Sequence, residues 1–108
     1  MKTLNFSISY EQFLRPDGSL CSALPENVQD PKKALDAYQT MVFMRAFDAK
    51  AIALQRTGKL GTYPSILGQE AIGTAIGHAL SADDVFAPYY RDFCTQYLRG
   101  VSLMEIFL

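Results

Sequence analysis

Apolar side chains recur at helical spacing through residues 31–57. After Pro31, this is the longest stretch of the chain without a proline or a glycine. Asp30-Pro31 is a typical helix start, with aspartate as N-cap and proline where no N–H is needed. Gly58 follows at the position that often closes a helix. The pattern predicts a helix with two apolar stripes: Leu35, Tyr38, Met41, Val42, Ala49 and Ile52, and beside them Phe43, Phe47 and Leu54.

Shorter elements are expected after an ordered loop at residues 58–65. A second helix is predicted over residues 67–80, where Gly73 and Gly77 would permit close approach of another backbone. A short strand is predicted at residues 85–87 and a third helix at residues 92–99, ending at Gly100. Ser102 and Glu105 have the spacing of a capping box that opens a further helix.

The N-terminal residues have a different pattern. Loose alternation up to Leu14, followed by Pro16 and Gly18, predicts a hairpin that pairs residues 6–14 with residues 20–23. Residues 24–29 are expected to be a linker. We therefore divide the sequence into an arm over residues 1–30 and the start of a domain over residues 31–108.

The sequence ends at Leu108, soon after the start of the last predicted helix. A helix this short is marginal without tertiary packing. We therefore expect the 108 residues to be the first part of a longer chain, and to be incomplete as a domain.

Composition excludes several classes of function. A net charge of -1 with 19% charged residues gives no electrostatic basis for binding nucleic acid or an anionic membrane. The N-terminus lacks the apolar run of a signal peptide, and no stretch of 18 apolar residues predicts a membrane span. Cys21 and Cys94 match no metal or redox spacing, which favours two reduced thiols and the cytoplasm.

Candidate chemistry is sparse when the residues are taken singly. The glycines and lysine of residues 58–62 lack the P-loop arrangement and fit a helix end with a turn. His78, the single histidine, excludes a histidine metal cluster and fits a packed or surface role. Tyr89, Tyr90 and Arg91 form the most suggestive cluster, because a guanidinium fork binds phosphate and tyrosine hydroxyls add donors. The alternative is an arginine–carboxylate pair beside aromatic core residues.

Five segments gain meaning when they are considered together. They are residues 44–48 (Met-Arg-Ala-Phe-Asp), 54–61, 68–71 (Gly-Gln-Glu-Ala), 90–92 (Tyr-Arg-Asp) and 98–101 (Leu-Arg-Gly-Val). In this order and at these intervals, residues 31–108 resemble the alpha subunit of the two-subunit, thiamine-diphosphate-dependent 2-oxo acid dehydrogenases, pyruvate and branched-chain types alike. The preceding hairpin resembles the N-terminal arm of bacterial members.

The resemblance implies a doubly wound α/β fold that binds thiamine diphosphate, of which this chain is the mostly helical N-terminal part. It implies oxidative decarboxylation of a 2-oxo acid, pyruvate first, with transfer of the acyl group to lipoyl. Branched-chain 2-oxo acids and acetoin are the alternative substrates. The implied partners are a beta subunit, in a heterotetramer, and a lipoyl-bearing acyltransferase component. The magnesium ligands would lie outside this chain, and these residues alone would be inactive.

The family's residue roles carry over at a few positions. Tyr90 and Arg91 match the pair that contacts thiamine diphosphate, and no residue here matches a proton-transfer group. Tyr63 matches an aromatic residue near the substrate in bacterial and branched-chain members. Pro64 stands where some pyruvate-specific members have a histidine, so substrate identity stays open. A non-catalytic helical association module is the rival interpretation.

Overall fold

A computed structural model describes residues 4–107, apart from the side chain of Asn27. The chain divides into two compact units, Met1–Pro31 and Lys32–Leu108, which are described separately below. No helix in the described part of the chain is both long and apolar enough to cross a membrane.

The first unit contains the predicted turn but not the predicted strands. The Gly18 amide donates to the Arg15 carbonyl over 2.9 Å, and Gly18 has the positive φ of 83° that glycine tolerates. A single antiparallel bridge joins Leu14 to Leu20. The hairpin prediction is therefore confirmed only next to its turn, where the Arg15 amide donates to Ser19 and the Cys21 amide to Phe13. The outer pairs are not formed, because a two-stranded ribbon without a covering layer is marginal. The short 3-10 helix η1, Glu26–Val28, occupies the predicted linker.

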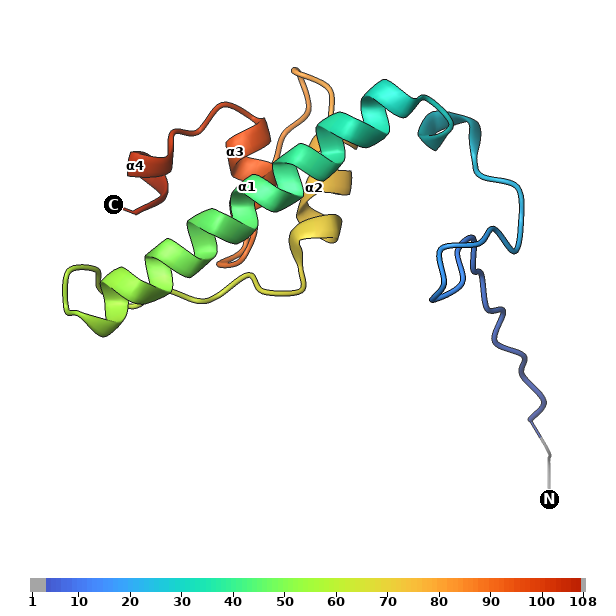
Figure 1. Ribbon diagram of the computed structural model, residues 1–108, viewed down its shortest axis with the longest axis horizontal. Helices are drawn as coiled ribbons and strands as arrows, with labels where there is room; N and C mark the ends of the chain where they lie inside the picture. Colours follow the sequence, from blue (N-terminus) through green and yellow to red (C-terminus); the bar gives the residue numbers. More distant parts are fainter. Residues whose placement is uncertain (1–3, 108) are drawn as a thin grey trace. The chain divides into compact units, whose positions relative to one another are not determined.

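The long helix α1, Pro31–Arg56, confirms the prediction for residues 31–57 (Figure 1). It ends in a Schellman motif: the Gly58 amide donates to Gln55 over 3.0 Å and the Lys59 amide to Leu54 over 2.9 Å. Gly58, with a φ of 70°, supplies the left-handed residue that this motif needs.

One face of α1 is buried, and its members follow helical spacing: Met44, Phe47, Asp48 and Ala51. Leu35, Tyr38 and Val42, from the first predicted stripe, are each more than half exposed in this chain. These three residues of the first predicted stripe are thus left largely uncovered by the described residues.

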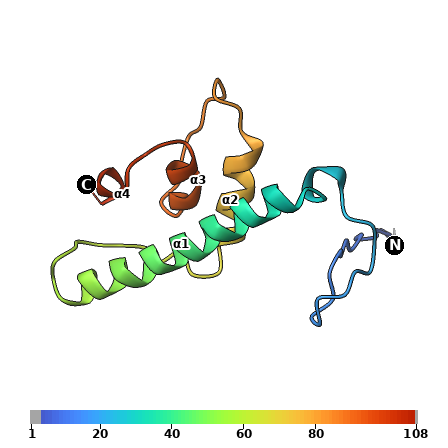
Figure 2. The same ribbon diagram turned by 45° about the horizontal axis from the view of Figure 1, so that its top comes forward.

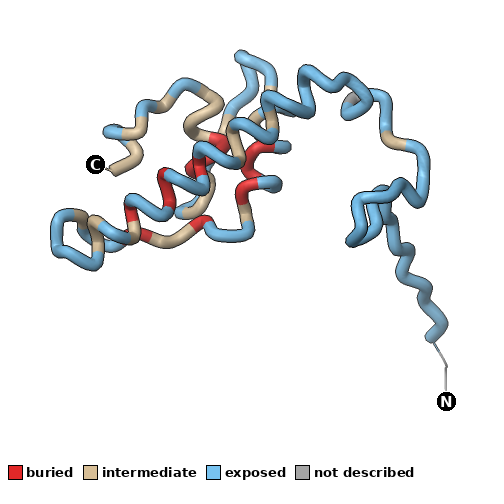
Figure 3. The backbone as a smooth tube through the Cα atoms, in the orientation of Figure 1, coloured by how far each residue is buried: buried red, intermediate tan, exposed pale blue. Residues whose placement is uncertain are grey.

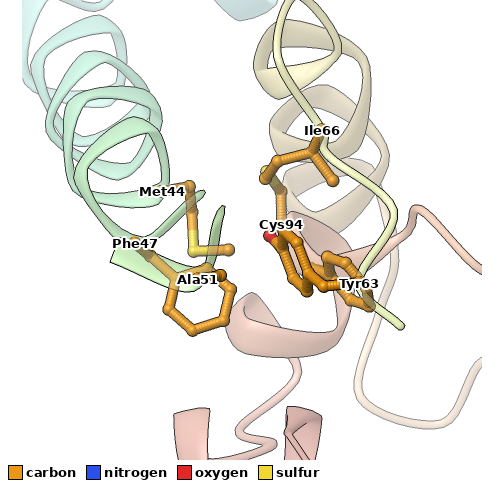
Figure 4. Packing of buried hydrophobic residues seen from close by; sticks show 7 residues of the cluster. Met44, Phe47, Ala51, Tyr63, Ile66 and Cys94 are labelled. Atoms are coloured by element: carbon orange, nitrogen blue, oxygen red, sulfur yellow. The ribbon is translucent and has the colours of Figure 1, made fainter. Parts of the chain in front are cut away.

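The core forms where the loop after α1 turns back along the helix, as the two ribbon views show (Figures 1 and 2). Met44, Phe47 and Ala51 of α1 face Tyr63 and Ile66 of this loop (Figure 4). Phe93 and Cys94 of the helix α3, Phe93–Leu98, complete the cluster. Figure 3 shows the buried positions gathered where these segments meet.

The helix α2, Glu70–Ala79, packs against α3. It begins three residues later than predicted because Gly68 has a φ of 85° and sits in a turn closed by the Gln69 amide and the Ile66 carbonyl, 2.8 Å apart. The expected role of Gly73 and Gly77 is confirmed: both lie against α3, and the Thr95 hydroxyl donates to the Gly73 carbonyl over 2.8 Å.

The last helix, α4, Leu103–Ile106, carries the predicted capping box between Ser102 and Glu105. The strand predicted at residues 85–87 is absent: Val85 is almost fully exposed, with no neighbouring strand for pairing. The described residues are thus helical, without a strand, and the doubly wound sheet implied by the resemblance is not seen in them.

Candidate functional site

Arg91 lies in the loop between α2 and α3, immediately before Asp92, the residue at the N-cap position of α3. Its guanidinium donates from Nη1 to the carbonyl oxygen of Ser65, in the loop after α1. It also lies over the ring of Tyr90, 5.0 Å from the ring centroid, a cation–π geometry. Two contacts therefore hold a half-buried cation at the junction of two loops.

The rest of the cluster is anchored through Tyr89. Its hydroxyl donates to Gln69 over 2.6 Å, and its ring meets the Tyr90 ring edge-on with centroids 5.1 Å apart. Its backbone amide donates to Asp92 over 2.8 Å. Tyr90 itself is 63% exposed. In the structure these adjacent side chains are in contact with one another, while their role in binding stays a prediction.

Arg99 fixes the loop that carries the cluster. Its guanidinium donates to the carbonyls of Ser81 and Asp84 over 3.0 and 2.8 Å. Because α3 begins just after Arg91 and is followed directly by Arg99, its C-cap residue, the loop is held at both ends by residues next to this helix. The cluster thus sits on a positioned segment and not on a free loop.

Tyr63, expected near a substrate, is only 6% exposed. Its ring stacks on Phe93 with centroids 5.3 Å apart, and its hydroxyl donates to Asp48 over 2.9 Å. Burial, followed by the hydrogen bond to Asp48, raises the pKa of the Tyr63 hydroxyl well above its usual range. Tyr63 is therefore a neutral core residue in this structure, and contact with a substrate stays a prediction.

Asp48 is a functional candidate that the sequence interpretation missed. It is 4% exposed and accepts hydrogen bonds from Tyr63, Ser65 and Ile66. The available signal was its position: it shares the helical face of Met44, Phe47 and Ala51, where a carboxylate needs partners.

Glu70 forms a second buried carboxylate site. It is paired with Arg45, whose side chain is 54% exposed, and accepts from the Gly68 amide over 3.0 Å. The hydrogen bond from Arg45 is the main cause that lowers the pKa of Glu70. The ion pair joins the first turn of α2 to α1, a contact that the sequence analysis did not predict.

A groove of about 330 Å³ opens between α1, α2 and α3, away from the tyrosine–arginine cluster. Asp36, Thr40 and His78 lie on its wall beside Phe43 and Tyr97. Exposed His78 fits the surface role given to it. Among residues 4–107, no group of three or more histidine, cysteine or acidic side chains is arranged to hold a metal ion.

The chemistry of the cluster suits an anion. A guanidinium has five N–H donors in a fork, and the Ser65 carbonyl accepts from one of its nitrogens. The exposed Tyr90 ring covers one face of that cation and brings a further hydroxyl donor. Such a donor set fits phosphate oxygens. The alternative interpretation was an arginine–carboxylate pair, but the partner that Arg91 has here is a backbone carbonyl.

Comparison with known proteins gives a consistent result. The profile of the family described as "Dehydrogenase E1 component" matches residues 38–108. The chain is 36% identical over 110 residues to "Pyruvate dehydrogenase E1 component subunit alpha" of Bacillus cereus, covering 100% of this chain and 29% of that protein.

Other relatives carry the same name. The chain is 36% identical over 99 residues to the protein of Bacillus subtilis (strain 168), covering 90% of this chain and 26% of that one. For Staphylococcus epidermidis the identity is 34% over 98 residues, with the same coverage of 90% and 26%. The chain thus spans between a quarter and a third of the length of these curated relatives. No solved structure matches.

Proposed function

Since this chain belongs to the dehydrogenase E1 component family, we propose that it forms the N-terminal part of the alpha subunit that decarboxylates a 2-oxo acid. The acyl group is then passed to the lipoyl group of an acyltransferase component. Pyruvate is the substrate that we propose first, because the relatives are named as pyruvate dehydrogenase subunits. Branched-chain 2-oxo acids and acetoin are the alternatives.

The observation that carries the proposal is the fixed guanidinium of Arg91 beside the exposed Tyr90. When bound, thiamine diphosphate supplies the electron sink that decarboxylation of a 2-oxo acid requires. Arg91 binds the diphosphate through its remaining N–H donors, and the Tyr90 hydroxyl adds another donor. Binding and orientation of the cofactor are the contributions of this chain, and no proton transfer is assigned to its residues.

Other parts of the site belong to partners or to other segments in this proposal. The magnesium ion that accompanies the diphosphate takes its ligands outside these residues. The rest of the doubly wound α/β fold and the beta subunit, in a heterotetramer, complete the pocket. The presence of two free cysteines fits a cytoplasmic protein.

A non-catalytic association module is the second candidate. It is favoured by the exposed apolar side chains of α1, namely Leu35, Tyr38 and Val42. Such a module has no need for a cationic cluster that binds diphosphate, so cofactor binding separates the two candidates.

The test is calorimetric titration of the assembled enzyme with thiamine diphosphate and magnesium. Charge-assisted hydrogen bonds contribute about 1.5–3 kcal/mol each. Loss of one to two such bonds in Arg91→Ala should therefore raise the Kd by roughly ten- to a thousandfold. Arg91→Lys should restore only part of the affinity, because a point charge does not reproduce the fork.

Arg56→Ala is the matched control, because Arg56 is an exposed arginine at the end of α1. It should leave the Kd unchanged. An unchanged Kd in Arg91→Ala would remove this residue from the site and leave the association module as the better proposal.

A further inference from the structure

The carboxylate of Asp48 holds the loop after α1 at three points. Its Oδ1 accepts from the Tyr63 hydroxyl over 2.9 Å and from the Ile66 amide over 2.8 Å. Its Oδ2 accepts from the Ser65 hydroxyl over 2.7 Å. A carboxylate buried to this extent is stable only when hydrogen bonds replace its hydration, so the three donors are fixed as a set.

Ser65 connects this carboxylate to the tyrosine–arginine cluster. Its side chain donates to Asp48, while its backbone carbonyl accepts from Nη1 of Arg91. The Ser65 hydroxyl also accepts from the Leu67 amide over 3.2 Å, so its orientation is fixed from both sides. The direction of the Ser65 carbonyl, and with it the place of the guanidinium, follows from the contacts to Asp48.

We propose that Asp48, acting through Ser65, is a positioning residue that aims the Arg91 guanidinium at the cofactor diphosphate. This inference rests on the proposed function of Arg91. An arginine held at one nitrogen presents its other donors in a fixed direction, and the ordering of its side chain is then complete before the ligand binds. Neither Asp48 nor Ser65 touches the ligand in this arrangement.

The experiment uses the assembled enzyme and the Kd for thiamine diphosphate in the presence of magnesium. Ser65→Ala removes the hydroxyl link and keeps the carbonyl; the Kd should rise about fivefold, the effect of one hydrogen bond. Asp48→Asn should raise the Kd by about tenfold or more, as substitutions of supporting residues behind a binding group do. Ser65→Thr keeps a hydroxyl and should restore most of the affinity. Asp36→Asn, an exposed aspartate on the same helix, is the control and should leave the Kd unchanged.

A merely structural role is separated by repeating Ser65→Ala in the Arg91→Ala background. If Ser65 acts through Arg91, its substitution should have no further effect there. An equal loss of affinity in both backgrounds would overturn the inference. If Asp48→Asn does not fold, the comparison of Ser65→Ala in the parent and in the Arg91→Ala background decides alone.

The outcome also distinguishes the inference from its premise. A raised Kd in Arg91→Ala together with an unchanged Kd in Ser65→Ala and Asp48→Asn overturns the positioning role and leaves the proposed function standing. An unchanged Kd in Arg91→Ala overturns both.

Discussion

Gly73 of α2 lies so close to Cys94 of α3 that a Cβ atom at the glycine would stand 2.8 Å from the cysteine Cβ. The same helix pair meets again one turn later, where a Cβ at Gly77 would stand 2.9 Å from the Cβ of Leu98. Both distances are shorter than ordinary van der Waals contact, so the two helices pack at a separation that only glycine permits.

Gly73→Ala and Gly77→Ala should therefore each lower the melting temperature of the subunit. Overpacking of this kind costs about 1–3 kcal/mol, more than the gain in helix propensity from glycine to alanine. Thermal unfolding followed by circular dichroism measures the effect. Gly61→Ala is the control, because Gly61 has open space around it and no positive φ. A rise in melting temperature for both helix variants would show that the glycines are incidental.

Glu70→Gln should lower the free energy of unfolding of the subunit at neutral pH. In acid, the difference in this free energy between the variant and the unsubstituted protein should become smaller. Arg45 lowers the pKa of Glu70 below its ordinary value of 4.5. A carboxyl whose pKa is lowered by folding contributes stability that is present above about pH 4.5. This stability is lost as the pH falls through the pKa of the folded state. Denaturant unfolding at a series of pH values tests this sign. A difference that stayed constant into the acid range would contradict the role of the ion pair.

The two thiols should differ in reactivity. Cys94 is 2% exposed, and burial, followed by the charge of Glu70, raises its pKa to about 11. Cys21 is exposed. Near pH 8, a thiol reagent should modify Cys21 rapidly in the native protein and Cys94 only after denaturation. In Cys21→Ser the rapid phase should disappear; its persistence would mean that Cys94 is accessible.

Residues that act on their near neighbours made most of the helical structure predictable. Pro31 sets a helix limit through its fixed φ, and Gly58 and Gly100 through the positive φ that glycine tolerates. The capping box of Ser102 needs a partner only three residues away. The outer pairs of the hairpin and the strand at residues 85–87 were wrongly predicted for the opposite reason. A strand requires a neighbour to bond with, and local alternation does not show whether one is present.

The candidate site was predictable only in part for a similar reason. Arg91 and Tyr90 stood out through their chemistry, and the structure brings them together. Their support comes from Ser65 and Asp48, which are distant in sequence and have no special spacing. For Tyr63 the expectation of a nearby substrate came from the family resemblance alone and stays a prediction. The structure adds that its hydroxyl donates to Asp48.

The contacts of Asp48 also bear on how fast this unit assembles. They close loops of 15, 17 and 18 residues, and the bond from Arg91 to Ser65 closes one of 26. The entropy of loop closure rises only slowly with length, and topologies rich in such short closures fold quickly. Once α1 has formed, Asp48 can therefore accept its hydrogen bonds from the loop after α1 early in folding. The position of Arg91 is then set by contacts that are close in sequence.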